Sequence, residues 1–362
     1  MGKLRVALIF GGKSGEHEVS ITSAMSVYKA LDKSKYDITL VGIDKNGRWV
    51  TPDAADIQAN LDTPRKIDLG KSREAFHFDP APGANSKFDV FVPILHGTYG
   101  EDGTIQGLFD LAQVAYVGSG VIGSAVGMDK ELAKRVLEHA GLPVVPYITV
   151  RRYEFDREPR KFLDEAEKRF GFPYFVKPAN MGSSVGVHKV KNVADAAGLL
   201  KDAFKYDTKV LIERGVNARE LEISVLGNNE PKASVVGEVV PNHEFYSYEA
   251  KYIDAKGADL FIPARNLSEG QVAQIQKLAV QCFSALECAG MARVDFFLDK
   301  NSGEFFINEI NTIPGFTSIS MYPKMWEASG LPYPRLLDRL IELALERHRE
   351  RAALKTTYEV KS

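Results

Sequence analysis

The chain has 362 residues, of which 26% are charged and 44% hydrophobic, and its formal net charge at pH 7 is −2. A chain of this length usually has more than one hydrophobic core, so two or three domains are expected. The net charge is small, so the composition gives no reason to expect binding to nucleic acid or to a membrane surface. Neither a signal-peptide-like segment nor an apolar run of membrane-spanning length occurs, so we expect a cytoplasmic protein.

The first third of the chain predicts a parallel α/β domain. Residues 4–10 form an apolar run that ends in Gly11-Gly12, which is typical of a buried central strand, and residues 19–31 should form the helix that follows it. Further elements are expected as strands at residues 36–43, 88–95 and 115–117 and as a helix at 105–111. This alternation predicts a doubly wound sheet, in which ligands bind beyond the carboxyl ends of the strands.

The two loops expected at that edge contain candidate ligand-binding side chains. Glu16 precedes a helix whose N-cap we place at Ser14 or nearby, and its carboxylate could hold a substrate ammonium or could merely complement the helix dipole. His96 ends a strand and is the better candidate for contacting a ligand, although an isolated histidine is more often structural. Glu101 and Asp102 would cap the next helix.

Two glycine patterns in this third suggest other functions and are set aside. Gly12-Lys13-Ser14 lacks the earlier glycine of a Walker A loop, because Ala7 stands in its place. Residues 118–123 have the glycine spacing of a dinucleotide fingerprint, which also needs an acid about 20 residues further on at the end of a strand. Glu138 lies near that distance but falls in a helical stretch.

The middle of the chain predicts a smaller α+β lobe. A helix is expected at residues 129–141, with Asp129 as its N-cap and Gly141 just beyond its end, and the proline-punctuated stretch 142–146 marks a plausible domain boundary. Two further helices on a small antiparallel sheet would complete the lobe. The helices are expected at residues 160–170 and 193–204, and strands at 187–190 and 209–213.

A glycine- and serine-rich loop in this lobe is the first sign of a nucleotide site. Residues 175–186, FVKPANMGSSVG, lead from a strand into a loop whose backbone N–H groups could hold phosphate, with Lys177 adding positive charge, but a simple hairpin turn explains the pattern almost equally well. Lys130 is a second lysine that could reach a phosphate. Glu213 and Glu220 could bind an adenine amine and ribose hydroxyls, or could be ordinary surface charges of a hinge.

The last third predicts a larger antiparallel sheet. Strands are expected at residues 221–226, 232–240, 290–298 and 305–311, and helices at 268–286 and 333–353. The segment 241–263 has little regular pattern, and its length and aromatic content favour a lid that excludes water. Cys282 and Cys288, which we place on one apolar helix but on different faces, are expected to be buried core residues without a disulfide or metal.

Polar residues on the last two strands indicate a metal site. Because strand residues alternate between faces, Arg293 shares a face with Asp295, and Glu309 shares one with Asn311. Three oxygen donors and an arginine suit Mg²⁺ that bridges phosphates. The alternative is a salt bridge from Arg293 to Glu309 or Asp295. We favour the metal because asparagine would add nothing to a salt bridge. The Gly/Ser/Thr-rich loop 312–320 could bind a carboxylate or an oxyanion through its N–H groups.

Five motifs occur together in the chain: GGKSGEHEVS at 11–20, HGTYGEDGTIQG at 96–107, GSSVG at 182–186, EAKY at 249–252 and NEINTIPG at 308–315. In combination they are specific, and over nearly its whole length the chain resembles the D-alanine–D-alanine ligases of the ATP-grasp superfamily. The resemblance implies an N-terminal α/β domain over residues 1–120, a small α+β ATP-grasp lobe over 121–214, and a C-terminal lobe over 215–362 with the lid at 241–263.

The resemblance also implies roles for individual residues. The nucleotide would contact Lys130, Lys177, Gly182, Ser183, Ser184, Glu213, Glu220 and Phe245. Two Mg²⁺ ions, for which Mn²⁺ could substitute, would be bound by Asp295, Glu309 and Asn311. The catalytic residues would be Glu16, Ser183, Tyr252, Arg293 and Gly315. The D-alanine substrates would contact His96, Lys251, Ser320 and Met321.

In that family pattern, the carboxylate of the first D-alanine attacks the γ-phosphate of ATP, and the amine of the second displaces phosphate from the acyl phosphate through a tetrahedral intermediate. Glu16 would bind the first ammonium and connect with Ser183 and Tyr252, while Arg293 and the Gly315 N–H would form the oxyanion hole. Family members that use D-lactate usually lack a tyrosine at the position of Tyr252, so an amine is the expected second substrate. The resemblance further implies a homodimer that supplies the dipeptide for peptidoglycan.

Three alternatives remain at this point. The first is another ATP-grasp carboxylate–amine ligase, or a D-alanine–D-lactate ligase, and the loops at Glu16 and Ser320 would decide it because they select the substrates. The second is a nucleotide-responsive binding protein, which would not need all four of the polar strand residues. The third is a dehydrogenase that uses the fingerprint at residues 118–123, which NAD binding would test.

Overall fold

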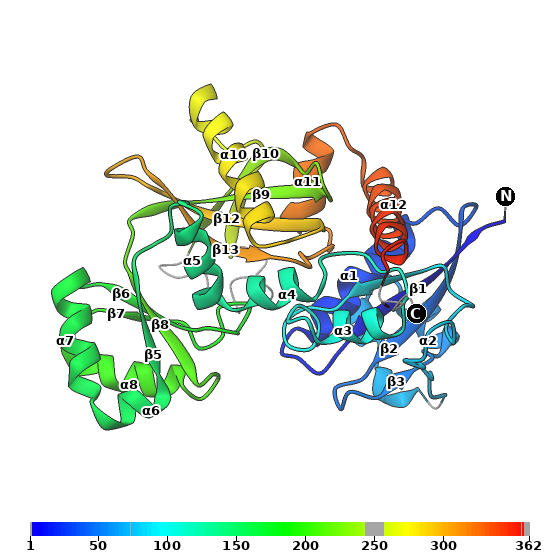
Figure 1. The fold of residues 1–362 in the computed structure, drawn as a ribbon, viewed down its shortest axis with the longest axis horizontal. Helices are drawn as coiled ribbons and strands as arrows, with labels where there is room; N and C mark the ends of the chain where they lie inside the picture. Colours follow the sequence, from blue (N-terminus) through cyan, green and yellow to red (C-terminus); the bar gives the residue numbers. More distant parts are fainter. Residues whose placement is uncertain (1, 73, 243–256, 356, 358–362) are drawn as a thin grey trace, which may run out of the picture.

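The computed structural model describes residues 2–72, 74–242, 257–355 and 357, and within these residues the chain forms three β-sheets. Figure 1 shows the N-terminal sheet on one side, the small central sheet on the other, and the large C-terminal sheet joining them. This arrangement is the predicted combination of a parallel α/β domain and two α+β lobes. No helix in the described part of the chain is long and apolar enough to cross a membrane.

The first sheet has the strand order β3-β2-β1-β4, in which β2, β1 and β4 run parallel and β3 runs antiparallel. Its elements are β1 (Leu4–Gly11), α1 (His17–Ala30), β2 (Tyr36–Ile43), β3 (Trp49–Val50), α2 (Ala54–Asn60), two short 3₁₀ turns (Pro64–Lys66 and Leu69–Lys71), β4 (Val90–Ile94) and α3 (Thr104–Leu111). The main strands and helices agree closely with the prediction. The strand expected at 115–117 is wrong, because only a bridge between Phe91 and Tyr116 forms there.

Gly11, the last residue of β1, cannot carry a side chain. Its φ is +94°, and a Cβ atom would lie 2.2 Å from the Ile43 carbonyl oxygen. We expect Gly11→Ala to destabilise the protein by more than about 3 kcal/mol. Gly47→Ala is the matched control, since Gly47 has a φ of +88° but no atom within 4 Å of its Cβ position; it should cost only about 1–2 kcal/mol. Urea unfolding of both variants measures the difference, and equal losses would show that the close approach is unimportant.

The second sheet is antiparallel, with the order β5-β8-β6-β7. Two helices precede this lobe, α4 (Val121–Met128) and α5 (Lys130–His139). The strands of its sheet are β5 (Tyr147–Arg151), β6 (Tyr174–Pro178), β7 (His188–Val190) and β8 (Lys209–Arg214). Its helices are α6 (Arg152–Arg157), α7 (Pro159–Phe170) and α8 (Val193–Ala203). Asp129 caps α5 by accepting a hydrogen bond from Leu132 N, as predicted. The sequence analysis missed α4, β5 and α6.

The third sheet is also antiparallel and has the order β11-β10-β9-β12-β13. Its elements are β9 (Ala218–Gly227), β10 (Lys232–Pro241), β11 (Ala258–Phe261), α10 (Glu269–Ala285), β12 (Gly290–Asp299), β13 (Phe305–Asn311), α11 (Met321–Ala328) and α12 (Tyr333–Ala352). Two expectations need correction. The segment 241–263 includes the regular strand β11, and Cys288 lies beyond the end of α10, although both cysteines are buried and free.

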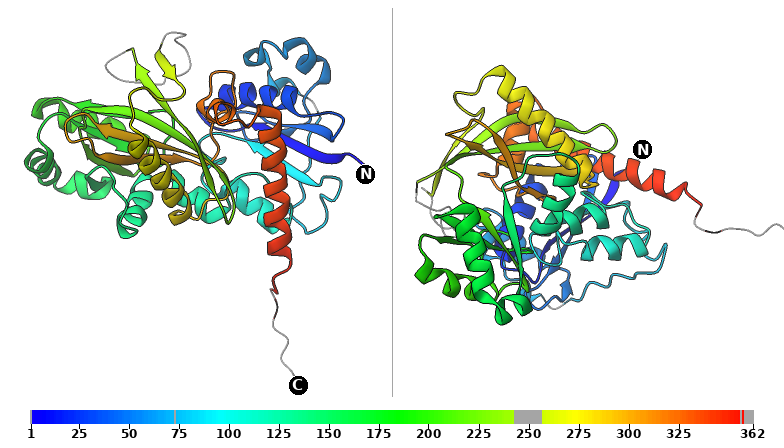
Figure 2. Two further views of the ribbon diagram at one scale, coloured as in Figure 1. Left: turned by 90° about the horizontal axis from the view of Figure 1, so that it is seen from above. Right: turned by 60° about the vertical axis from the view of Figure 1, so that its left-hand side comes forward.

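Three hydrophobic cores show how the lobes are joined. The first core combines strands of the N-terminal sheet with one face of α12, which packs against that domain in Figures 1 and 2. The second core places Ala133 and Leu137 of α5 under the large sheet. The third core belongs to residues 148–212 of the central lobe alone. Helix α5 is therefore anchored to the large lobe while its N-terminal end adjoins the small one; the domain boundaries given above stay predictions.

Candidate nucleotide and substrate site

Two neighbouring cavities lie where the three sheets meet. The larger, of about 1000 Å³, is lined by β6, the loop after it, the end of β8, and strands of the large sheet. The smaller, of about 510 Å³, is lined by the N-terminal loops, by β12 and β13, and by the loop that precedes α11. Both cavities are lined by Ser183, Glu220 and Glu309, so a molecule in one would adjoin a molecule in the other at these residues.

The serine loop between β6 and β7 has an unusual backbone. Ser183 and Ser184 have φ values of 53° and 58°, which lie in the left-handed region that side chains other than glycine rarely adopt. Gly186 follows with a φ of 70°. Such local strain persists only when the surroundings enforce it, and it is concentrated at ligand-binding sites. The geometry therefore favours a binding loop over the simple hairpin turn.

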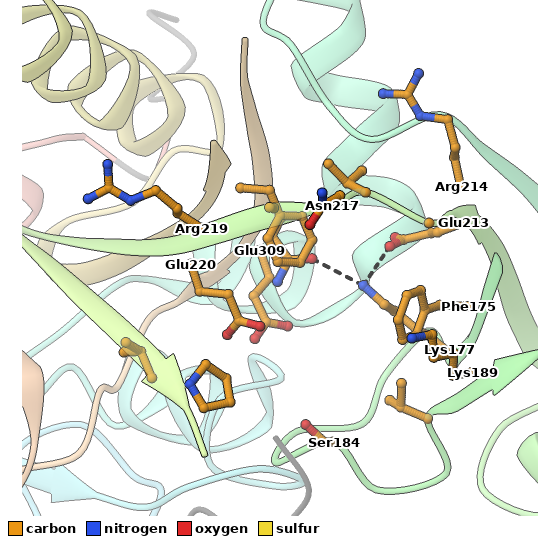
Figure 3. A pocket seen from close by; sticks show the side chains of 18 of the residues that line it. Phe175, Lys177, Ser184, Lys189, Glu213, Arg214, Asn217, Arg219, Glu220 and Glu309 are labelled. Carbon is orange, nitrogen blue, oxygen red and sulfur yellow. Dashed lines mark hydrogen bonds and ion pairs between the residues drawn. The ribbon is translucent and has the colours of Figure 1, made fainter. Parts of the chain in front are cut away.

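Lysines from both lobes converge beside this loop. Lys177 Nζ on β6 lies 3.1 Å from Asn308 Oδ1 of β13 and 2.5 Å from Glu213 Oε2. Figure 3 marks the contact between Lys177 and Glu213 with a dashed line. Lys130 Nζ, at the start of α5, donates a 2.8 Å hydrogen bond to the Met181 carbonyl and lies 3.3 Å from Glu309 Oε2. Two ammonium groups thus border the cavity on the side of the serine loop, as a site for phosphate requires.

Glu213 lies in the larger cavity, but its carboxylate is shared between two lysines. Lys134 Nζ lies 3.1 Å from Glu213 Oε1, on the side away from Lys177, and both side chains of this pair are only 2% exposed. Burial lowers the pKa of Lys134, while at Glu213 the two lysine charges outweigh burial and lower the pKa, so the carboxylate is ionised. The sequence analysis missed Lys134, although its spacing of four from Lys130 places both on one helix face.

The β12–β13 hairpin brings its four polar residues together as predicted. Arg293 pairs with Asn311 and Asp295 pairs with Glu309 across the two strands, and a bulge follows Asp295. Arg293 Nε and Nη2 donate to the two Asp295 oxygens at 2.6 and 2.7 Å, so the salt bridge that we weighed against the metal site is present. Our argument against it was wrong, because Asn311 Nδ2 donates a 3.0 Å hydrogen bond to the same carboxylate.

The chemistry of this donor set nevertheless fits a divalent cation. Asp295, Glu309 and Asn311 offer oxygen ligands, which hard cations such as Mg²⁺ prefer, and Glu309 borders both cavities. In the described part of the chain, no three His, Cys, Asp or Glu side chains form a metal-binding cluster. A cation here would therefore depend on the asparagine and on non-protein ligands. Arg293 has a second acid beside it, Glu222 Oε2 at 3.1 Å from Nε, which the sequence analysis also missed.

Glu16 links the N-terminal domain to the serine loop. The Ser183 hydroxyl donates a hydrogen bond to Glu16 Oε1, which is the connection that the motifs implied. A Cβ atom on either Gly97 or Gly182 would lie 2.8 Å from Glu16 Oε2, so glycine on both sides makes room for this carboxylate. The N-cap of α1, expected at Ser14 or nearby, is Glu16 itself, which makes no capping hydrogen bond, and Ser14 Oγ donates to the His96 carbonyl at 2.8 Å.

His96 and Glu101 hold the backbone of Ile313 from two sides. His96 Nδ1 lies 3.0 Å from the Ile313 carbonyl oxygen, and Glu101 Oε1 accepts a 3.2 Å hydrogen bond from the Ile313 N–H. His96 Nε2 contacts Ser23 Oγ at 3.2 Å. Burial lowers the pKa of His96, so the ring is neutral, and it lines the smaller cavity with both nitrogens engaged. The expectation that Glu101 and Asp102 cap α3 is wrong: Gly103 is the N-cap and receives no side-chain capping bond, although Asp102 Oδ1 accepts a 3.0 Å hydrogen bond from Thr104 N at the start of the helix.

The pKa of Glu101 yields a testable pH dependence. Burial, reinforced by the charge of Glu16, raises the pKa of Glu101 to about 8. The native state therefore keeps this proton to a higher pH than the unfolded state, and the stability that Glu101 contributes is lost as the pH rises from about 4.5 towards 8. We expect Glu101→Gln to gain stability relative to the parent protein over this range, by up to about tenfold in the unfolding equilibrium per pH unit. Urea midpoints at several pH values measure this, and a constant difference would contradict it.

The remaining predicted residues lie at the far wall of the smaller cavity. Gly315, Ser320 and Met321 all line it, and Ser320 is the N-cap of α11. Ser320 Oγ accepts a 2.9 Å hydrogen bond from Thr317 N, and a Cβ atom on Gly315 would lie 2.7 Å from that oxygen. The predicted site residues Phe245, Lys251 and Tyr252 lie outside the described residues.

A cavity between two antiparallel sheets, with a serine loop on one wall and acidic strands on the other, places the chain in the ATP-grasp class. The family model described as D-ala D-ala ligase N-terminus matches residues 5–119, and the one described as D-ala D-ala ligase C-terminus matches residues 136–342. The chain belongs to the D-alanine–D-alanine ligase family, which confirms the resemblance drawn from the motifs.

Individual relatives agree with this assignment. The chain is 50% identical to D-alanine–D-alanine ligase A of Bradyrhizobium diazoefficiens, over 98% of this chain and 99% of the relative, and 50% identical to ligase A of Salmonella typhimurium, over 99% and 100%. Among solved structures, the D-alanine–D-alanine ligase from Coxiella burnetii matches with a TM-score of 0.82 at 39% identity, covering 97% of each chain. The VanG D-Ala:D-Ser ligase from Enterococcus faecalis matches with a TM-score of 0.82 at 35% identity, covering 95% and 100%.

Proposed function

We infer that this chain uses ATP to join two molecules of D-alanine into D-alanyl-D-alanine, the dipeptide for peptidoglycan synthesis. Relatives that carry the name of this activity are about half identical to the chain over nearly their full length. The observation that carries the proposal is the junction of the two cavities at Ser183 and Glu309, where the loop that we propose for phosphate meets the cavity that we propose for D-alanine. A ligase that activates a carboxylate with ATP needs this adjacency.

The first step requires the γ-phosphate and the first D-alanine to meet in line. Lys130, Lys177 and the N–H groups of the serine loop would hold the phosphates, and Glu220 would take the ribose hydroxyls. Glu16, oriented by Ser183, would bind the ammonium of the first D-alanine. The carboxylate of this D-alanine would then attack the γ-phosphorus. The bond from the γ-phosphorus to the β–γ bridging oxygen would break, and ADP would leave. Positioning and charge neutralisation supply most of the rate in such transfers.

Asp295, Glu309 and Asn311 would hold two Mg²⁺ ions, or Mn²⁺ in their place. Bound Mg²⁺ supplies neutralisation of the charge that develops on the transferred phosphoryl group. Asp295 now shares both oxygens with Arg293, so it would give up part of that ion pair on binding a cation. Glu222 would keep Arg293 in an ion pair when Asp295 binds the cation.

The second step joins the amine of the second D-alanine to the acyl carbon and releases phosphate. Arg293 and the Gly315 N–H would stabilise the oxyanion of the tetrahedral intermediate, and the hold of His96 and Glu101 on Ile313 would fix the loop that carries Gly315. Ser320, Met321 and Lys251 would bind the carboxylate end of the second D-alanine, and Tyr252 favours an amine over D-lactate. We further propose that the protein is a cytoplasmic homodimer; light scattering of the purified protein tests the dimer.

The test is phosphate release by the purified protein with Mg·ATP and D-alanine, L-alanine or no amino acid, with product masses from the same tubes. Release with D-alanine alone and a dipeptide mass would support the proposal. D-alanine mixed with D-lactate or D-serine near neutral pH tests the second site, and a preference for lactate would refute the role given to Tyr252. No release with either alanine, while ATP still binds, would favour another ATP-grasp carboxylate–amine ligase.

A further inference from the structure

Lys134 is a buried cation that the proposed chemistry does not use directly. Its side chain is 2% exposed, on the inner face of α5, and its ammonium lies 5.7 Å from the centre of the Tyr147 ring. Burying a charge is costly unless it is paired, and the partner of Lys134 is the equally buried Glu213. An apolar residue could occupy this position at lower cost, so the presence of a lysine calls for a reason.

The charges around Glu213 suggest that reason. Glu213 lies between two lysines, with Lys134 at 3.1 Å from one oxygen and Lys177 at 2.5 Å from the other. One carboxylate between two ammonium groups leaves a net charge of +1. Lys134 and Glu213 are enclosed, whereas Lys177 is 12% exposed and lines the larger cavity. The unbalanced positive charge is therefore presented to the cavity at Lys177.

Without Lys134 the same carboxylate would balance Lys177 alone. The resulting pair would be neutral, and its 2.5 Å contact would hold the Lys177 ammonium against Glu213 instead of leaving its charge to an incoming phosphate. Lys134 forms an ion pair with the far oxygen of that carboxylate, while Lys177 also lies 3.1 Å from Asn308 on the opposite sheet. The buried ion pair therefore acts on the charge that Lys177 presents.

We propose that Lys134 is a positioning residue for the nucleotide: by neutralising Glu213 from within the protein, it leaves the charge of Lys177 available to the phosphates. This inference rests on the proposed function, since it assumes that a nucleotide occupies the larger cavity. It differs from a purely structural role in one respect. A structural lysine would be needed whatever the charge of residue 213, whereas a charge-balancing lysine becomes dispensable once residue 213 is neutral.

The experiment compares the full-length protein with Lys134→Met and with the double variant Lys134→Met/Glu213→Gln. The single variant leaves Glu213 paired with Lys177, and the double variant leaves no buried charge unpaired, so neither exposes a lone buried ion. Binding of ADP and of adenosine is measured by calorimetry without added metal. Lys168→Met, an exposed lysine on α7 of the same lobe, is the control for removing a charge at the surface.

We expect Lys134→Met to weaken ADP binding by about 10- to 100-fold and adenosine binding by less than about threefold, because adenosine has no phosphate. The ratio of ADP affinity to adenosine affinity, from which any adenine contact of Glu213 cancels, should recover in the double variant to within about fivefold of the parent protein. Unchanged ADP binding by Lys134→Met, or a ratio in the double variant as low as in the single one or lower, would overturn the inference. If Lys134→Met is insoluble, Lys134→Gln removes the same charge and is read in the same way. Failure of the parent protein to bind ADP would instead refute the nucleotide site itself.

Discussion

Replacing Arg293 with lysine is expected to slow the D-alanine-dependent release of phosphate by about 10²–10³-fold at saturating substrate. Arg293 donates hydrogen bonds to both oxygens of Asp295 and also contacts Glu222. This set of contacts requires a planar cation with several donors. Lysine retains the charge but is a point donor, so it cannot hold both acids and reach the oxyanion as well. Initial rates over a range of D-alanine concentrations separate the effect on kcat from that on KM.

The matched control for this variant is Arg169→Lys, on the exposed face of α7, where the arginine forms an ion pair with its helical neighbour Glu165. That change should leave the rate within about twofold, because exposed ion pairs contribute little. Thermal unfolding of both variants shows whether the fold is retained. A kcat for Arg293→Lys within about threefold of that of the parent protein would show that Arg293 does not stabilise the transition state.

Replacing Glu309 with glutamine should lower kcat by about 10²-fold or more and raise the Mg²⁺ concentration needed for half-maximal rate. Glu309 lies opposite Asp295 on the hairpin, borders both cavities and contacts Lys130 at 3.3 Å. Glutamine keeps the shape but loses the charge that a divalent cation requires. Titration of Mn²⁺, followed by its electron paramagnetic resonance signal, measures the loss of affinity without any turnover.

Glu304→Gln provides the comparison for this second variant, since Glu304 lies on the exposed turn of the same hairpin, away from both cavities. It should change neither the rate nor the Mn²⁺ affinity. Unaltered Mn²⁺ binding by Glu309→Gln would place the cation on other ligands, even if turnover fell.

Features that depend on short-range patterns could be predicted from the sequence. The register of the last hairpin follows from alternation along two strands joined by a short turn, which is why Arg293, Asp295, Glu309 and Asn311 meet as expected. The cap of α5 at Asp129 has a local signature as well. The serine loop was ambiguous in sequence, because its left-handed serines are a property of the folded backbone.

Contacts between distant segments could not be predicted in this way. Glu101 looked like a helix cap because its chain neighbours favour that role, whereas its partner Ile313 lies 212 positions further on. Lys134 was missed, since nothing near it in sequence shows that β8 brings Glu213 against it. Glu222 adjoins Arg293 only because β9 pairs with β12. Short elements such as β5 and β11 lacked the length that a periodic pattern needs.

The shared core of the N-terminal sheet and α12 bears on how the chain is synthesised. Leu336, Leu340 and Ile341 of α12 are buried with Val6 and Leu8 of β1, although translation of the helix follows that of the strand by more than 300 codons. Helix α1 covers part of this apolar face early, but the part that α12 covers stays exposed while almost all of the protein is being made. Since exposed strands of this kind invite aggregation, nascent chains stalled before residue 333 should depend on chaperones, and release of the final helix should end that dependence.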